Sequence, residues 1–234
     1  MTTLETLQTK DTGFPSTEMP GLCYENRNTS CRRAFDTPLG RVFLQDACPP
    51  ELVAQLRADD GLRAFARLPE REHQLLLNIA RLPDASLTLA YSATGEIVGQ
   101  VTRVPADSWW REQEPIYEVA VEVSARWRQH GVARQLLTLA LERDSLEQAI
   151  LVGLGLSWHW DTEGMGIAPM RYRLLIAQLF APYGFMEYMT TEPNIMMSPA
   201  NILLVRIGGS VEQKVLNQFL NRLFQPEKDA RFFI

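Results

Sequence analysis

Residues 116–142 restrict the possible fold more than any other part of this 234-residue chain. The segment from Ile116 to Val123, IYEVAVEV, alternates in character with the two-residue period of a β-strand. One face of that strand carries Tyr117 and three valines, which suits a surface packed under helices. From Val132 onward, leucines and alanines recur at helical spacing. We therefore predict a strand, a tight basic loop and a helix, which begins where unpaired backbone N–H groups can bind an anion.

The loop between this strand and helix, Arg128-Gln-His-Gly-Val-Ala133, has the form Arg/Gln-x-x-Gly-x-Gly/Ala. Gly131 allows the backbone to approach a phosphate group closely, Ala133 is small for the same reason, and Arg128 adds a fixed positive charge. Six residues with one glycine also begin many helices that bind nothing, so the pattern needs its context. In this context it predicts a phosphate site formed by Arg128, Gln129, His130, Gly131, Val132, Ala133 and Arg134.

The other face of the predicted strand carries Glu118 and Glu122 beside Ile116 and Ala120. Buried glutamates are rare unless they are paired or functional, so this face is expected to line a cleft. The alternative is that both glutamates form ion pairs with arginines across the sheet. Two like charges on one face also resist joint ionisation, which would raise a pKa in the pair.

The strand, loop and helix together resemble the acetyl-CoA-binding motif of the GNAT acetyltransferases. From about residue 40 to residue 224 the chain further resembles one bacterial branch, the acetoin-utilisation acetyltransferase family. Two segments make this assignment specific, because they lie outside the general GNAT motif: Trp158-His-Trp-Asp161 and Ser198-Pro-Ala-Asn201. The remaining likeness is carried by residues 71–83, 95–102, 162–165, 191–195 and 206–208.

The resemblance implies an α/β (α+β) fold: a mixed, mostly antiparallel sheet with a splayed strand pair, flanking helices and a C-terminal helical extension. It implies acetyl-CoA as the acetyl donor, with no metal, and we expect the backbone of Val121 and Val123 to hydrogen-bond the pantetheine. It also implies a protein acceptor, acetyl-CoA synthetase, whose active-site lysine would be acetylated and the synthetase switched off. Two alternatives stay open, an acetyltransferase for small amines and a non-catalytic acyl-CoA sensor that inhibits the synthetase.

A lysine acceptor must lose a proton before it can attack a thioester. With a reference pKa near 10.4, only about one lysine side chain in 2,500 is a free amine at pH 7. The penalty is roughly 4.6 kcal/mol, and a positioned base typically supplies a factor of about 10²–10⁴. Glu122 is our first candidate for this base, because it lies close to the phosphate loop. Glu118 is the second, and would act through a water molecule or hold the lysine.

Composition limits the other classes of function. The chain is 46% hydrophobic and 22% charged, as is usual for a globular enzyme domain, and its net charge of −5 argues against nucleic-acid binding. No apolar run reaches the roughly 18 residues of a membrane span, and Met1-Thr-Thr-Leu-Glu-Thr6 lacks the plan of a signal peptide. We expect a cytoplasmic protein. The three cysteines, without zinc-ligand spacing, are expected to be free thiols: Cys23, Cys31 and Cys48.

We divide the chain into a flexible extension at residues 1–35, a core at 36–195 and a C-terminal helical extension at 196–234. The predicted strands are 40–45, 86–91, 96–103, 116–123, 148–155 and 184–190, and the predicted core helices are 49–56, 70–80, 132–142 and 168–180. A short helix is predicted from Ser198 to Gly208, and a capping box at 210–213 would open another that runs to Phe224. The apolar stripe of that last helix is expected to pack on its own domain, with a partner surface as the alternative.

Several aromatic and polar residues have two possible roles each. We assign a substrate-binding role to Trp158, His159, Trp160 and Asp161. His159 would form a dyad with Asp161 at the substrate mouth, or instead be a buried hydrogen-bonded residue. Tyr183 is either a general acid or part of an ordinary helix exit. The tryptophans of the 105–115 loop either gate a channel or pack onto the domain, and we favour packing.

Overall fold

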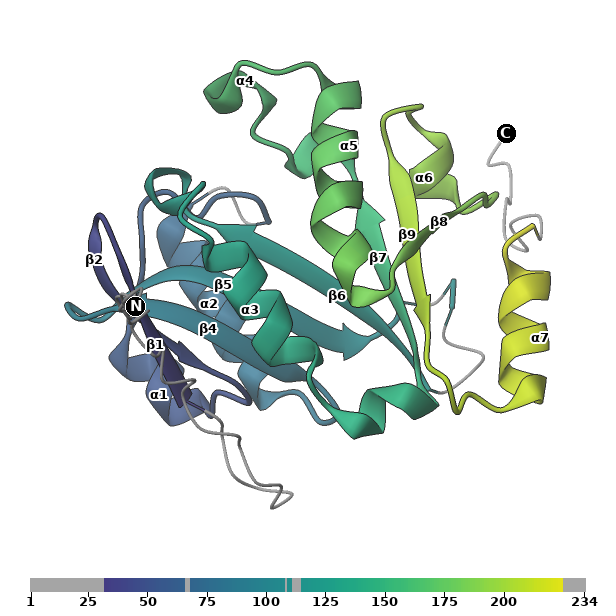
Figure 1. Ribbon diagram of the computed structural model, residues 1–234, viewed down its shortest axis with the longest axis horizontal. Helices are drawn as coiled ribbons and strands as arrows, with labels where there is room; N and C mark the ends of the chain where they lie inside the picture. The colour runs from purple at the N-terminus through teal and green to yellow at the C-terminus, as the bar shows by residue number, and fades with distance from the viewer. Residues whose placement is uncertain (1–31, 66–67, 108, 111–114, 225–234) are drawn as a thin grey trace, which may run out of the picture.

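The computed structural model describes residues 32–65, 68–107, 109–110 and 115–224 (Figure 1). Its strands within these ranges form one sheet in the order β1-β2-β4-β5-β6-β7-β9-β8, with β3 beside β5. The strands are β1 (Arg32–Thr37), β2 (Gly40–Gln45), β3 (Arg57–Ala58), β4 (Ser86–Ser92), β5 (Glu96–Pro105), β6 (Ile116–Val123), β7 (Ile150–Gly155), β8 (Met186–Tyr188) and β9 (Ile202–Ile207). All pairings are antiparallel except β3–β5 and β6–β7, which confirms the predicted mixed, mostly antiparallel sheet.

Helices cover both faces of this sheet (Figure 1). They are α1 (Pro50–Gln55), α2 (Pro69–Arg81), α3 (Val132–Leu141), α4 (Thr162–Met165), α5 (Pro169–Phe180), α6 (Pro193–Met196) and α7 (Gln213–Arg222). The face of β6 that carries Val119 and Val123 packs under α3 and α5, whereas the face that carries Ile116 meets α7. Helices α1 and α2 cover the strands at the other end of the sheet.

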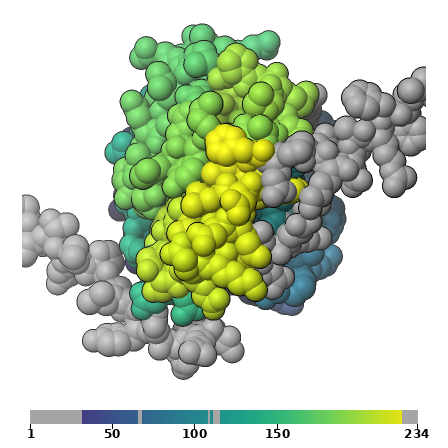
Figure 2. All heavy atoms as spheres, turned by 90° about the vertical axis from the view of Figure 1, so that its right-hand side faces the viewer, coloured from purple at the N-terminus to yellow at the C-terminus, as the bar shows by residue number. Residues whose placement is uncertain are grey.

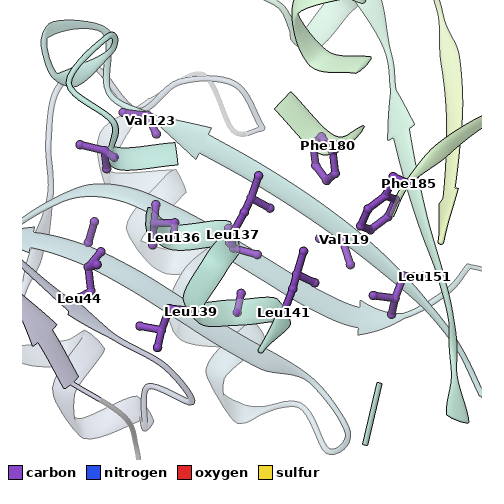
Figure 3. Packing of buried hydrophobic residues seen from close by; sticks show 14 of the residues in the cluster. Leu44, Val119, Val123, Leu136, Leu137, Leu139, Leu141, Leu151, Phe180 and Phe185 are labelled. Carbon is purple, nitrogen blue, oxygen red and sulfur yellow. The ribbon is translucent and has the colours of Figure 1, made fainter. Parts of the chain in front are cut away.

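The interior is densest where α3 crosses the sheet. Its leucines meet the valines of β6, and Phe180 and Phe185 close the same cluster from the α5 side (Figure 3). Leu136 and Leu137 are fully buried, and each such side chain stabilises the fold by about 1.5–3 kcal/mol. The helix is therefore fixed on the sheet, and with it the loop that precedes it.

Strands β6 and β7 pair over only three residues each. Their parallel register ends where Glu118 faces Val152, although β6 runs on to Val123 and β7 to Gly155. Beyond that point the two strands separate, which confirms the predicted splayed pair.

The structure corrects the predicted C-terminal part of the core. Residues 202–207, predicted to lie in a short helix, form β9 between β7 and β8. The run Ile-Leu-Leu-Val-Arg-Ile is apolar without alternation because it is buried on both faces, and such a run suits an inner strand as well as a helix. The segment starting at Ser198 is a turn, in which the Asn201 N–H donates to the Ser198 carbonyl. The sheet thus continues past residue 195, our predicted end of the core.

Both ends of the described chain also differ from prediction. Strand β1 begins at Arg32, so residues 32–35 belong to the sheet and not to the predicted extension, of which residues 1–31 lie outside the described residues. The predicted capping box does not form, because the Ser210 N–H donates to the carbonyl of Glu147 and α7 starts three residues later. Cys48 is a buried free thiol, and Cys23 and Cys31 lie outside the described residues.

Helix α7 packs on its own domain, as predicted. Phe219 and Leu223 are buried beside Trp109 and Trp110, and the Trp110 and Phe219 rings lie 5.4 Å apart. Figure 2 shows this helix in yellow, forming much of the surface at its end of the sheet. The two tryptophans therefore anchor α7, which confirms the packing alternative for their loop. None of the helices among the described residues is long and apolar enough to cross a membrane.

Candidate functional site

A cavity of about 1190 Å³ opens where β6 and β7 separate. Its walls come from four places that are far apart in the sequence. They are β3 with the loop after it (57–61 and 63–65), β6 with the turn and helix start that follow it (118–126, 128–129 and 133), the end of β7 with the segment after it (153–156, 158–161 and 165), and one side of α5 (172, 175–176 and 179–180). Glu96 and Leu204 complete the lining. Both predicted glutamates and all four predicted substrate residues lie on these walls.

The exposed backbone of β6 points into the gap. The Ser124 N–H donates to the Val98 carbonyl, so even-numbered residues of β6 bond to β5. In an antiparallel pair the intervening residues turn their N–H and C=O groups to the opposite side, here toward β7. Beyond the splay point these groups belong to Val121 and Val123. The Val123 carbonyl accepts a bond from Arg128 Nε, so on this side Val121 offers both an N–H and a C=O group and Val123 offers its N–H.

The predicted phosphate loop reaches the cavity in part. Arg128, Gln129 and Ala133 line it, whereas the other predicted members are absent from its walls: His130, Gly131, Val132 and Arg134. Gly131 has φ +82° as the residue that precedes α3, a left-handed conformation that favours glycine. Val132 is a core residue.

Arg128, predicted to supply positive charge to the phosphate loop, has a carboxylate partner. Its guanidinium forms an ion pair with Asp161, which in turn accepts a bond from the Gly164 N–H at the start of α4. The pKa of Asp161 lies below its usual range, and the hydrogen bond from Arg128 is the largest cause. The pair links the loop before α3 to the turn after β7.

Glu122 is 7% exposed and has two different oxygen atoms. Its Oε1 accepts bonds from the N–H groups of Arg63 (2.7 Å) and Ala64 (2.8 Å), whereas its Oε2 is buried with no hydrogen-bond partner among the described residues. Burial, and then the charge of Glu72, raise the pKa of Glu122 to about 7, against the lowering effect of the two N–H groups. Such a pKa suits a general base that works near neutral pH.

Glu118 lies on the same cavity wall, two pleats from Glu122. Burial raises the pKa of Glu118 to about 7, and the charges of Asp107 and Glu192 add to the effect. A pKa is raised in this pair, as predicted, but the predicted cause is wrong. Burial and other carboxylates raise the pKa of each glutamate. Neither Glu118 nor Glu122 takes part in an ion pair within the described ranges, so the alternative of arginine partners finds no support there.

The four predicted substrate residues line the cavity, but His159 and Asp161 form no dyad. His159 Nδ1 lies 2.7 Å from the Ala64 carbonyl, whereas Asp161 faces Arg128. A helical turn at Ser157–His159 ends between them, so the two side chains diverge. Trp160 stacks on Tyr172 with 5.1 Å between ring centres.

The two segments that made the resemblance specific meet in space. Asn201 Oδ1 accepts a bond from the Ser157 N–H (2.8 Å), and Asn201 Nδ2 donates to the Asn194 carbonyl (2.7 Å). Asn201 is buried, so both ends of its amide are satisfied away from water. It fixes the turn that carries His159.

Tyr183 does not line the cavity. Its hydroxyl donates to the Arg134 carbonyl at 2.8 Å and lies 3.1 Å from the Thr138 hydroxyl. These contacts join the end of α5 to α3, which fits the helix-exit alternative for Tyr183.

Sequence reasoning missed the 59–65 loop, which closes one side of the cavity. Asp59 accepts bonds from the Ser124 hydroxyl and the Gly61 N–H and pairs with Arg126, so the loop is tied to the end of β6. Asp59 and Ser124 lie 65 residues apart in the chain and share no periodic pattern, so no local signal marked them. The described part of the chain contains no cluster of His, Cys, Asp and Glu that could hold a metal ion.

Comparisons with known proteins agree with this architecture. Residues 51–152 match the model of the acetyltransferase (GNAT) family. The chain is 31% identical over 201 residues to the acetoin utilization protein AcuA of Bacillus licheniformis, and 31% identical over 200 residues to that of Bacillus subtilis. Each alignment covers 83% of this chain and 94% of the relative.

A solved structure extends the agreement to three dimensions. The crystal structure of an acetoin utilization protein from Exiguobacterium sibiricum superposes with a TM-score of 0.78 at 29% identity. The match covers 85% of this chain and 97% of that one. The resemblance read from the sequence is confirmed in family and in fold. The chain belongs to the acetoin-utilization branch of the GNAT acetyltransferases, and it is an acyltransferase.

Proposed function

We propose that this acyltransferase is an acetyl-CoA-dependent protein lysine N-acetyltransferase of the cytoplasm, which acetylates and inactivates acetyl-CoA synthetase. The observation that carries the proposal is the buried carboxyl of Glu122, a residue of the cavity wall at the splayed strands, whose Oε2 has no hydrogen-bond partner among the described residues. The acceptor follows from the family resemblance described above, which implies a protein lysine of this one enzyme.

The cavity suits coenzyme A along its length. An extended pantetheine beside β6 would find the N–H and C=O groups of Val121, as an added strand would. The pyrophosphate would then lie at Arg128, Gln129 and Ala133, where the N-terminus of α3 supplies N–H groups and a favourable dipole. In this pose the thioester would lie on the Glu122 side of the gap.

In the proposed reaction Glu122 Oε2 takes a proton from the lysine ammonium, directly or through one water molecule. The free amine attacks the thioester carbonyl, a C–N bond forms and the C–S bond breaks. Coenzyme A leaves as the thiolate and takes up the second proton lost by nitrogen. A backbone N–H of β6 would stabilise the tetrahedral oxyanion. Glu118, with its own raised pKa, would hold the incoming ammonium.

The direct test is incubation with acetyl-CoA and the acetyl-CoA synthetase of the same organism, followed by mapping of modified lysines by mass spectrometry. The proposal expects one acetylated active-site lysine and loss of synthetase activity in step with it. Acetylation of free amines alone would favour the small-molecule alternative. Inhibition of the synthetase without acetylation would favour the non-catalytic alternative, although Phe219 and Leu223 of the α7 stripe are buried in their own domain.

The proposed base predicts a pH dependence. Glu122 must be ionised to accept a proton, and its pKa is raised to about 7, so kcat/KM is expected to fall as the pH drops through that value. Assays from pH 5.5 to 9 with one acceptor would show this limb. Because the acceptor lysine also ionises, the control is the Glu122→Gln variant, which keeps the acceptor limb and should lose the limb near pH 7.

Gly131 gives a prediction for donor binding. In Gly131→Val the branched side chain would have to adopt φ +82°, at a cost of about 1–2 kcal/mol, although no atom within 4 Å blocks it. We expect the dissociation constant for coenzyme A to rise about tenfold by calorimetry, which corresponds to about 1.4 kcal/mol. Gly40→Val is the matched control, since Gly40 has φ +116° with equally open surroundings in the β1–β2 turn. Equal loss of binding in both variants would contradict a phosphate role for the loop.

A further inference from the structure

His159 and Glu122 hold the same residue from opposite sides. The Ala64 N–H donates to Glu122 Oε1, and the Ala64 carbonyl is the partner of His159 Nδ1 at 2.7 Å. A carbonyl oxygen can only accept, so Nδ1 must carry the hydrogen in this contact. The imidazole is fixed in turn by its neighbours, with ring centres of Phe65 at 5.4 Å and Trp158 at 6.0 Å.

The loop around Ala64 has a second anchor on the α2 side. The Phe65 N–H donates to Glu72 Oε1 at 2.8 Å, in the same peptide unit whose carbonyl meets His159. Glu72 and Glu122 therefore bind consecutive N–H groups of one loop. The His159 contact is the one that comes from the far side of the cavity, from the turn that Asn201 fixes.

We propose that His159 is a positioning residue for Glu122: by holding the Ala64 carbonyl, it keeps the Ala64 N–H on Oε1 and leaves Oε2 as the proton-accepting atom. This inference rests on the function proposed above. It assigns a role to the Trp-His-Trp-Asp segment, which the general acetyltransferase motif lacks. It also explains how a side chain in the turn after β7 acts on a carboxylate in β6.

The groups around Glu122 predict the direction in which its pKa should change when the His159 contact is lost. Glu72 from α2 raises its pKa, Tyr172 from α5 and His159 face the same region, and the Gln100 side chain from β5 lowers its pKa. The Ala64 and Arg63 N–H groups also lower it. If the His159 contact is lost and these bonds weaken, the pKa of Glu122 should rise. Less carboxylate is then present at pH 7, and activity should recover as the pH increases.

Two amide variants of His159 have the same polarity but place their N–H groups differently, so they test whether the position of the donor matters. In His159→Asn the amide N–H takes the place of Nδ1–H and can still reach the Ala64 carbonyl. In His159→Gln the amide lies at the place of Nε2 and cannot. We expect His159→Asn to remain close to the wild type, and His159→Gln to lose about fivefold in kcat/KM at pH 7, which corresponds to a rise of about one pKa unit from a value of about 7. The loss should shrink toward pH 9, with the dissociation constant for coenzyme A unchanged.

The matched control is His73→Asn. His73 Nε2 lies 2.9 Å from the Val53 carbonyl between α1 and α2, away from the cavity, and asparagine cannot maintain that contact. This variant should keep the wild-type pH profile even if its stability falls.

The inference is overturned if His159→Gln keeps full activity, if its loss is the same at every pH, or if His159→Asn is equally impaired. Failure of the proposed function has a different signature, since Glu122→Gln would then be as active as the wild type. Loss of activity in Glu122→Gln with a normal profile in His159→Gln would remove the positioning role alone.

Discussion

Replacing Glu122 with glutamine is expected to slow acetyl transfer at least about 100-fold while acetyl-CoA still binds, since a positioned base supplies about 10²–10⁴. Glutamine retains a carbonyl oxygen that can accept from the Arg63 and Ala64 N–H groups, so the 59–65 loop should stay in place. The amide that replaces Oε2 cannot take a proton from an ammonium group. Single-turnover rates with saturating acetyl-CoA would measure the chemical step, and calorimetry would measure donor binding.

Glu118→Gln is the comparison for this experiment, because Glu118 has a similar pKa and lines the same cavity. We expect it to raise KM for the protein acceptor more than it lowers kcat, as fits a residue that holds the ammonium. If Glu118→Gln caused the larger loss of kcat and Glu122→Gln the smaller one, the assignment of the base would be reversed. Retained activity in both variants would show that the acceptor loses its proton to solvent.

Replacing Phe219 with alanine is expected to lower the free energy of unfolding by about 3–5 kcal/mol, as is usual for a buried phenylalanine. Phe219 is 0% exposed, and its ring packs on Trp110 under the sheet. Arg222 reinforces the same contact, since its Nε donates to the Trp109 carbonyl at 2.6 Å and its guanidinium lies over the Trp109 ring. Urea unfolding followed by tryptophan fluorescence would measure the change.

Leu220 provides the control on the same helix. It is 39% exposed, so Leu220→Ala should change stability by no more than about 0.5 kcal/mol. A loss in Leu220→Ala as large as that in Phe219→Ala would mean that the helix is anchored by its outer face, contrary to the packing described. Because Phe219 lies outside the cavity walls, the folded fraction of Phe219→Ala should keep the wild-type kcat.

The central part of the fold was predictable because its signals are local. The strand at 116–123 has a clean alternation, Gly131 marks the start of α3, and the spacing of leucines defines the buried face of that helix. Strand β9 was missed because an unbroken apolar run has no period, and the serine and proline before it resemble a helix start. What decides between the two is the space between β7 and β8, which the local sequence does not encode.

The candidate site was predictable to a lesser degree. The face of Glu118 and Glu122 follows from strand periodicity, and both do line the cavity. The partners of Glu122 were not predictable, since the Arg63 and Ala64 N–H groups come from an irregular loop 58 and 59 residues away. The expected contact of His159 with Asp161 failed for a related reason. Nearness in sequence did not outweigh a turn that sends the two side chains in different directions.

The position of β9 has a consequence for how the molecule is made. It follows β8 in the chain but lies between β7 and β8 in the sheet, so β8 has no neighbour to bond to until residues 202–207 have left the ribosome. The glycines of β7 that border the cavity lie beyond the pairing with β6, so they too gain a strand neighbour only then. A nascent chain that stops short of this strand would expose an apolar edge of β7, and the cavity beside that strand would gain its full wall only once residues 202–207 are in place.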